Sequence, residues 1–272
     1  MFIAEIGINH NGSIDLALEL IRKAKEAGAD VVKFQKRTPE ICVPESQRDI
    51  IKDTVFGTMT YFEYKKKIEF EKEEYDKIDS YCEEIGIQWT ASVWDIPSLH
   101  FLLQYPVPFI KIPSALMTHR PLLKEVNKLC KDKLVIVSNG GLDEKTFDKN
   151  MKLLSKCNTI VLACNSSYPT DNCDLNLSYL PILKQKYKTV GYSGHEPDYM
   201  ATLVAKSLGA EVIERHITLD KNMKGSDHKA SLNIEELKEL ISKLEEVETI
   251  LGEPQKVVSP QEAMVMTKLR YF

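Results

Sequence analysis

The chain alternates eight times between a short β-branched run and a longer stretch of helical period, and this alternation constrains the fold more than any other feature. Helix-ending signals support it, because Gly28, Gly86 and Gly209 each follow a helical stretch. Eight such units in 272 residues are typical of one closed α/β barrel, so we predict a (β/α)₈ TIM barrel. The predicted strands cover residues 2–6, 31–35, 87–91, 108–112, 134–138, 159–164, 189–193 and 212–216.

An open, doubly wound sheet is the alternative architecture. It would usually carry a glycine-rich fingerprint after its first strand, but residues 7–12 read Gly-Ile-Asn-His-Asn-Gly and not G-x-G-x-x-G. The stretch 36–70 is long, polar and weakly periodic, and we interpret it as an extended loop over the barrel mouth. We assign residues 1–257 to the barrel and residues 258–272 to a C-terminal tail.

Composition and charge narrow the class of function. With 36 Lys and Arg against 40 Asp and Glu, the chain lacks the basic character of a nucleic-acid-binding protein. No apolar run approaches the roughly 18 residues needed to span a bilayer, and the N-terminus has no basic head or cleavage site of a secretory signal. The six cysteines form no CxxC pair, which predicts reduced thiols. We therefore expect a cytoplasmic protein that acts on small molecules, without a nucleic-acid or membrane partner.

Polar residues end nearly all of the predicted strands. A strand buried on both faces should be apolar, yet these strands finish in lysines, hydroxyls, carboxylates or imidazoles. In a TIM barrel the active site lies at the C-terminal ends of the strands, so the set predicts a polar site at that rim. Lys33 and Lys111, together with neighbouring hydroxyls, suit a small anion that carries a phosphate and a carboxylate. The hydroxyl residues are Thr90, Ser114, Ser138, Ser166 and Ser193.

Two histidines end consecutive predicted strands. Adjacent barrel strands would bring His195 and His216 within reach of one ion. Two imidazoles completed by water or substrate suit Mn²⁺ or another divalent cation better than a closed structural zinc site. Glu214 and Asp227 lie close to this pair in the sequence and strengthen the prediction. Two further histidines fall in predicted rim loops: His10 and His228.

With these strand ends in order, the chain resembles the catalytic barrel of the sialic acid synthases, which include the N-acetylneuraminate, legionaminate and pseudaminate synthases. The resemblance implies a TIM barrel that condenses phosphoenolpyruvate with an N-acyl sugar aldehyde, such as N-acetylmannosamine, to give a 2-keto-3-deoxy nonulosonic acid and phosphate. The matching segments are residues 5–12 (EIGINHNG), 33–35 (KFQ), 111–114 (KIPS), 168–170 (YPT), 191–195 (GYSGH), 214–216 (ERH) and 227–231 (DHKAS).

The same resemblance implies a role for each matching residue. His195 and His216 would hold Mn²⁺. Catalytic residues that orient the sugar or a metal-bound water would be Glu5, Tyr168, Glu214 and Asp227. Substrates would be bound by Lys33, Gln35, Thr90, Lys111, Ser114, Ser138, Ser166 and Ser193.

The chain departs from the family pattern in two places. Family members usually carry an antifreeze-like domain after the barrel, which reaches into a partner's active site, and residues 258–272 correspond to the start of that linker. A homodimer formed through the barrels and a monomer therefore both stay open. Leu116 stands where the family usually has an acidic residue, which allows a different sugar or impaired chemistry.

Two other functions remain open. One is an octulosonate-type synthase that joins phosphoenolpyruvate to a phosphorylated pentose; it would need a basic pocket for a second phosphate, for which only Lys36 and Arg37 are suggested. The other is a non-catalytic homologue that binds phosphoenolpyruvate or a sugar. Leu116 favours that function, whereas the histidine pair and the complete set of lysines and hydroxyls oppose it.

Overall fold

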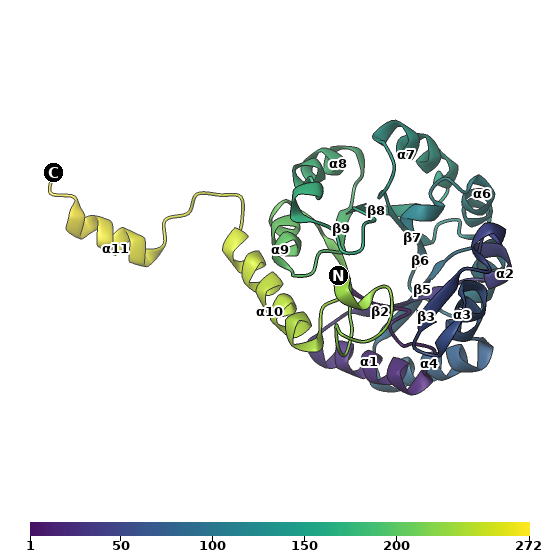
Figure 1. The fold of residues 1–272 in the computed structure, drawn as a ribbon. Coiled ribbons are helices and arrows are strands. Elements are labelled where there is room, and N and C mark those ends of the chain that lie inside the picture. Colours follow the sequence, from purple (N-terminus) through teal and green to yellow (C-terminus); the bar gives the residue numbers. More distant parts are fainter.

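The computed structural model describes residues 1–272, and its eight parallel strands close into a barrel (Figure 1). The order around the barrel is β1-β10-β9-β8-β7-β6-β5-β2. Each strand begins within two residues of its predicted start, so the predicted (β/α)₈ TIM barrel is confirmed. The strands are β1 (Phe2–Gly7), β2 (Val31–Lys36), β5 (Gln88–Val93), β6 (Ile110–Ile112), β7 (Leu134–Ser138), β8 (Asn158–Cys164), β9 (Val190–Gly194) and β10 (Val212–His216).

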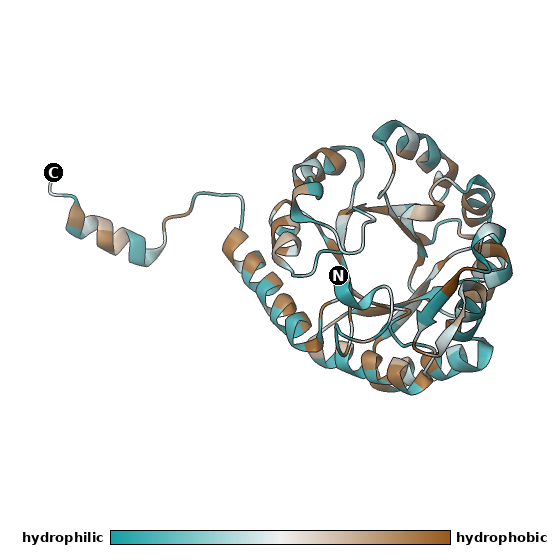
Figure 2. Ribbon diagram, viewed as in Figure 1, coloured by the Kyte–Doolittle hydropathy of each residue, from teal (hydrophilic) through white to brown (hydrophobic).

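Helices surround the barrel and end where the sequence predicts. The hydroxyl of Ser13 accepts a hydrogen bond from the Leu16 N–H at 3.3 Å, and Gly28 ends the first helix in the left-handed region with φ of 96°. In Figure 2 the outer helices alternate between brown and teal, as expected for helices with one buried and one solvent-facing side. They are α1 (Ile14–Ala27), α4 (Lys72–Ile85), α5 (Ile96–Leu102), α6 (Arg120–Leu129), α7 (Glu144–Met151), α8 (Leu180–Lys186), α9 (Met200–Ser207) and α10 (Ile234–Leu251).

The stretch between β2 and β5 is more ordered than the extended loop that we predicted. It contains α2 (Pro39–Cys42), an antiparallel hairpin of β3 (Ile51–Thr54) and β4 (Gly57–Thr60), and α3 (Tyr61–Ile68). The hairpin is mostly exposed, so it lacks the alternation of apolar and polar residues by which half-buried strands are predicted. We call residues 37–71 the β2–β5 insertion.

The barrel interior has an apolar floor beneath a polar layer. Successive side chains of a strand point to opposite faces, so residues two apart share the interior face. On six strands a buried apolar residue is followed, two positions later, by a residue of the polar layer. These pairs are Ile3 and Glu5, Val31 and Lys33, Phe109 and Lys111, Ile136 and Ser138, Leu162 and Cys164, and Val212 and Glu214.

The C-terminal segment lies apart from the barrel. Helix α11 (Pro260–Leu269) follows an extended stretch and has no buried residue, and Figure 1 shows it projecting away from the other helices. None of the helices, α10 included, combines the length and apolar character that crossing a bilayer requires.

Candidate active site

A cavity of about 210 Å³ opens at the C-terminal ends of the strands and brings together most of the predicted site residues. Every barrel strand contributes at least one interior side chain through its last residues, and the following loops supply the others. The predicted residues that line it are Glu5, Lys33, Gln35, Lys111, Ser114, Ser138, Ser166, Tyr168, Ser193, His195, Glu214 and His216.

The short strand β6 places Lys111 in this cavity, and β8 places Cys164 there. All eight strands of the barrel therefore line it. The convergence of charged and hydroxyl side chains from eight separate strands follows from barrel closure, which brings the C-terminal ends of all the strands to one rim.

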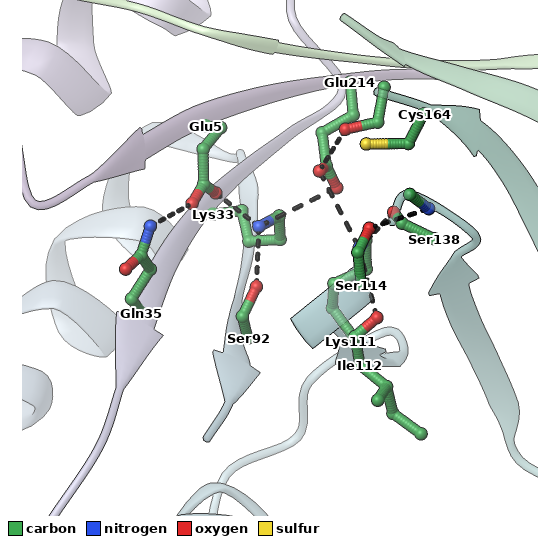
Figure 3. A network of polar contacts seen from close by, with 12 residues as sticks. Glu5, Lys33, Gln35, Ser92, Lys111, Ile112, Ser114, Ser138, Cys164 and Glu214 are labelled. Atoms are coloured by element: carbon green, nitrogen blue, oxygen red, sulfur yellow. Dashed lines mark hydrogen bonds and ion pairs between the residues drawn. The ribbon is translucent and has the colours of Figure 1, made fainter. Parts of the chain in front are cut away.

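Two buried lysines dominate the electrostatics of this catalytic cavity (Figure 3). The Lys33 Nζ lies 2.5 Å from Glu5 Oε2 and 3.7 Å from Glu214 Oε2. It also donates a hydrogen bond to Ser92 Oγ at 2.8 Å. The Lys111 Nζ donates to the hydroxyl of Ser138 at 2.7 Å and lies 3.8 Å from Glu214 Oε1. Each ammonium thus has both a carboxylate and a hydroxyl within reach.

The two carboxylates of the network differ in their ionisation. Burial raises the pKa of Glu5 to about 7, against the opposing effect of Lys33. Burial acts in the same direction on Glu214, but Lys111 and Lys33 outweigh it and lower the pKa of that carboxyl to about 2. Glu214 is therefore ionised at neutral pH, whereas Glu5 can exchange a proton there.

The two imidazoles lie side by side in the cavity, with ring centroids 5.5 Å apart. The Nδ1 atom of His195 is 2.7 Å from the Asn165 carbonyl oxygen, so it carries the proton and leaves Nε2 free as a ligand atom. The Nδ1 atom of His216 is buried and has no hydrogen-bond partner. A free ring nitrogen beside an unsatisfied one fits an open divalent-cation site.

The neighbours of the histidine pair limit the kind of metal site. No cluster of three or more His, Cys, Asp or Glu side chains is arranged to hold an ion. Water or substrate oxygens would therefore have to complete the coordination, which suits Mn²⁺ or a similar cation better than structural zinc. The ring of Tyr168 packs against His195, with centroids 4.0 Å apart, and limits its movement.

Strand β10 is held in place from its outer face. Arg215 lies between Glu214 and His216 in the sequence but points away from the interior, and its side chain is fully buried. Its guanidinium donates to Glu196 Oε1 at 2.8 Å and to the Thr202 hydroxyl at 2.7 Å. Since Glu196 follows His195, this buried ion pair connects the segments that carry the two imidazoles.

Thr90 is one predicted residue that does not line the catalytic cavity. Its hydroxyl donates to the Phe109 carbonyl oxygen at 2.7 Å, below the polar layer. Ser92, which sequence reasoning missed, lines the cavity instead and accepts a hydrogen bond from Lys33. Both residues share one face of β5, so the signal for Ser92 was present in the alternation of the strand.

Asp227 also lies outside the catalytic cavity, in a second cavity of about 250 Å³ that adjoins it. The two cavities share Gln35, Trp94 and Tyr168, so Asp227 faces the same open space from one side. His10 and His228 line neither cavity. His10 is stacked on Phe70, and the Nδ1 of His228 lies 2.8 Å from the Thr218 hydroxyl oxygen.

Leu116 lies outside the catalytic cavity as well. It belongs to a short 3₁₀ turn, Ser114–Leu116, and packs against the main core. The residues of that turn that reach the catalytic cavity are Ser114 and Ala115. The leucine at the usually acidic position therefore leaves the ion network and the histidine pair intact.

Comparisons with known proteins agree with this arrangement. Residues 20–256 match the model of the NeuB family. The chain is 39% identical over 273 residues to the N-acetylneuraminate-9-phosphate synthase of Mus musculus, covering 98% of this chain and 75% of that protein. It is 33% identical over 271 residues to the N,N'-diacetyllegionaminic acid synthase of Campylobacter jejuni, covering 96% and 80%.

A solved structure agrees in the same way. The chain superposes on N-acetylneuraminic acid (sialic acid) synthetase of Leptospira borgpetersenii, solved in complex with citrate, with a TM-score of 0.88 and 30% sequence identity. The match covers 98% of this chain and 90% of that one.

Proposed function

Because the chain belongs to the NeuB family, we propose that it condenses phosphoenolpyruvate with an N-acyl sugar aldehyde to a 2-keto-3-deoxy nonulosonic acid and phosphate, in a reaction that requires a divalent cation. One observation carries the proposal: two buried lysines and five serine hydroxyls converge on one cavity beside a pair of imidazoles. Phosphoenolpyruvate carries a phosphate and a carboxylate, which are the groups that such donors bind best.

Lys33 and Lys111 hold phosphoenolpyruvate in this proposal. Their ammonium groups neutralise its charge, and their contacts with Ser92 and Ser138 fix their positions before the substrate binds. Glu214 keeps the two lysines charged and close together. The hydroxyl groups that would donate to the remaining phosphate and carboxylate oxygens are those of Ser92, Ser114, Ser138 and Ser166. Ser193 lines the same cavity but donates to Glu214 Oε1 at 3.0 Å, so it would have to leave that carboxylate to bind the substrate.

His195 and His216 would hold the divalent cation, which supplies a Lewis acid for the aldehyde carbonyl of the acceptor. The protein places that carbonyl next to C3 of phosphoenolpyruvate, since both lie in one cavity of about 210 Å³. Tyr168 packs on His195 and lies where the catalytic cavity meets the adjoining one, so it would contact the acceptor.

The carboxylates act after the carbon–carbon bond has formed. Attack by C3 leaves positive character at C2, and the ionised Glu214 stabilises that centre. Water then adds to C2 and gives one proton to Glu5, which balances the proton that the former aldehyde oxygen takes up as it becomes a hydroxyl. The C–O bond to phosphate then breaks, the C2 hydroxyl becomes the keto group, and its proton leaves with the phosphate. Asp227 lies at the edge of the adjoining cavity, where it accepts hydrogen bonds from sugar hydroxyls.

The relatives leave two classes of acceptor open. The synthase of Mus musculus is named for a product phosphorylated at position 9, whereas that of Campylobacter jejuni is named for an unphosphorylated product. The proposed chemistry is the same for both classes, because the phosphate of the first would lie far from the aldehyde.

The proposal is tested by incubating the purified chain with Mn²⁺, phosphoenolpyruvate and a panel of acceptors. The panel contains N-acetylmannosamine, N-acetylmannosamine 6-phosphate and arabinose 5-phosphate, and each product is identified by mass spectrometry. We expect a nonulosonic acid or its phosphate, and no product after chelation or in His216→Ala.

Other results would contradict the proposal. Consumption of arabinose 5-phosphate alone would indicate an octulosonate-type synthase. Tight binding of phosphoenolpyruvate without turnover of any acceptor would indicate a non-catalytic homologue. Lys131→Met is the control variant, because Lys131 is exposed and does not line the cavity, and we expect it to keep full activity.

A further inference from the structure

Two cavities continue from the catalytic cavity toward the β2–β5 insertion. The first, of about 250 Å³, shares Gln35, Trp94 and Tyr168 with the catalytic cavity. The second, of about 330 Å³, shares Tyr61, Lys65 and Ser226 with the first. We call them together the outer cavities, and they connect the reacting centre to the hairpin of the insertion.

Positive charge exceeds negative charge in the outer cavities. Their carboxylates are Asp53 and Asp227, and Asp53 already forms an ion pair with Lys224 at 2.8 Å. Lys36, which the sequence suggested for a basic pocket, is not among the lining residues, because its ammonium is bound to Glu69 and to the Phe70 carbonyl. The lining cations are Arg37, Lys52, Lys65 and Lys224.

Lys65 is the most unusual of these cations, because it is buried and no carboxylate forms an ion pair with it, although Asp227 and Glu69 lie near enough to favour its charge. Only 7% of the residue is exposed, and no hydrogen bond or ion pair engages its ammonium. The Nζ atom lies over the rings of Tyr61 and Tyr64, at 5.3 and 5.5 Å from their centroids. Burial, with the charge of Arg37, lowers its pKa to about 8. A buried ammonium without an ion-pair partner, on the wall of a cavity, favours the binding of an anion.

Arg37 is a second cation on the wall of the outer cavity that adjoins the catalytic cavity. It is also 7% exposed, and its guanidinium lies over the ring of Trp94, 4.4 Å from the centroid. Its Nε is buried without a hydrogen-bond partner, and the nearest carboxylate oxygen, on Glu69, is 3.8 Å away. Arg37 can therefore accept a further anionic partner.

We propose that Lys65 and Arg37 form a second phosphate-binding site, and that the acceptor is an aldose with a phosphate at the end remote from its aldehyde. The inference rests on the proposed function, since phosphoenolpyruvate occupies Lys33 and Lys111 and leaves the outer cavities to the acceptor. Asp227 lines the same cavity as Lys65 and Arg37 and is the one carboxylate among its lining residues, so the two cations outnumber it and leave a net positive charge for a phosphate.

The inference is tested by comparing N-acetylmannosamine 6-phosphate with N-acetylmannosamine in the wild type, Lys65→Met, Lys65→Arg and Lys66→Met. In the wild type we expect kcat/KM to favour the phosphorylated sugar by at least about 100-fold. Lys65→Met should lose about 30-fold or more with that sugar and less than about 3-fold with the free one, because only the phosphate contact is removed. Lys66→Met is the matched control, since Lys66 is exposed and pairs with Glu40.

Lys65→Arg keeps the charge and should retain most of the preference for the phosphorylated sugar. This variant separates the loss of the charge from a folding defect that any substitution of Lys65 would cause. Equal use of both sugars by the wild type would overturn the inference and leave the proposed function standing. A preference that survives in Lys65→Met would overturn the assignment of the site. If neither sugar consumes phosphoenolpyruvate, the proposed function fails and the inference fails with it.

Calorimetry without phosphoenolpyruvate distinguishes the phosphate of a sugar from free phosphate. We expect N-acetylmannosamine 6-phosphate to bind the wild type at least about 10-fold more tightly than inorganic phosphate, and Lys65→Met to lose that binding. Equal affinities would show that the site holds free phosphate and would overturn the inference.

Discussion

The mouth of the barrel contains two groups of buried cations that differ in how their charge is balanced. Lys33 and Lys111 each lie within 4 Å of a carboxylate and donate to a serine hydroxyl. Lys65 has neither. Arg37 has a carboxylate oxygen 3.8 Å from its Nε and donates a hydrogen bond to Gln35 Oε1, but no carboxylate lies closer. The first group is satisfied before any ligand binds, whereas the second is completed only by an anion.

The difference follows from where the two groups lie in the fold. Lys33 and Lys111 project from barrel strands, where the positions of backbone and neighbours are fixed by the closed sheet. Arg37 and Lys65 belong to the β2–β5 insertion, which is outside that sheet. Groups that take part in the chemistry thus lie on the rigid part of the molecule, and groups that we assign to acceptor recognition lie on an added segment.

The largest effect is expected from the balanced group. Lys111→Met should lower kcat/KM for phosphoenolpyruvate about 10³-fold or more, because it removes a buried cation from the substrate and from Glu214. Steady-state kinetics measures the loss, and the exposed Lys131→Met variant serves as control. An unchanged kcat/KM would mean that phosphoenolpyruvate binds elsewhere.

Removal of a lysine from the two groups should also have opposite effects on the free energy of unfolding. Lys33→Met leaves buried carboxylates without their partner and should lower the free energy of unfolding by about 3 kcal/mol. Lys65→Met should raise it by about 1 kcal/mol at pH 7, since the lowered pKa of Lys65 means that folding disfavours its charge. This gain in the free energy of unfolding should decline above pH 8, where the folded protein begins to lose the proton of Lys65. It should vanish at a pH so high that the lysine is neutral in the unfolded chain as well. Urea unfolding at pH 7 and 10 measures the stability of both variants. An equal loss of stability in Lys33→Met and Lys65→Met would contradict the distinction between the two groups of cations.

Metal affinity should depend on neither group of cations. His216→Gln should weaken Mn²⁺ binding at least about 100-fold, because it removes one of two protein ligands. Lys65→Met should leave the affinity within about twofold of the wild type. Electron paramagnetic resonance of free Mn²⁺ measures binding without turnover, and tight binding by His216→Gln would place the metal elsewhere.

The smallest effect is a pH dependence of acceptor use. The charged groups around Lys65 are Arg37, Glu69 and Asp227, and the ring of Tyr64 stays neutral because burial raises its pKa to about 12. Above pH 8 the lysine loses its proton, so kcat/KM for the phosphorylated acceptor should fall up to tenfold per pH unit. The fall should be absent in Lys65→Arg, and an identical profile in that variant would exclude Lys65 as its source.

The fold could be predicted from the sequence because the barrel repeats one pattern eight times. Each β-branched run is followed by a helical stretch, so an error at one boundary does not change the topology. The β2–β5 insertion could not be predicted in this way. Its hairpin buries little, and the one strong turn signal is Gly57, the first residue of β4, with φ of 93°.

Two site residues show why the rest was harder to predict. We expected the strand that carries Thr90 to end at residue 91, whereas β5 continues to Val93 and places Ser92 in the catalytic cavity. Residues two apart point to the same face of a strand but lie at different heights in the barrel. An error of two residues in the end of a strand therefore predicts a residue below the cavity in place of one that lines it. Lys65 stands beside Lys66 in a run of three lysines, and only the packing of α3 determines which of them is buried.

The separation of the insertion from the barrel has a consequence for how this enzyme could change. The insertion of about 35 residues lies between β2 and β5 in the sequence, and these two strands still pair over their whole length. A change in its length or sequence would therefore leave the register of the eight strands unaltered. New acceptors could arise by replacement of that one module, with the bond-forming apparatus inherited unchanged.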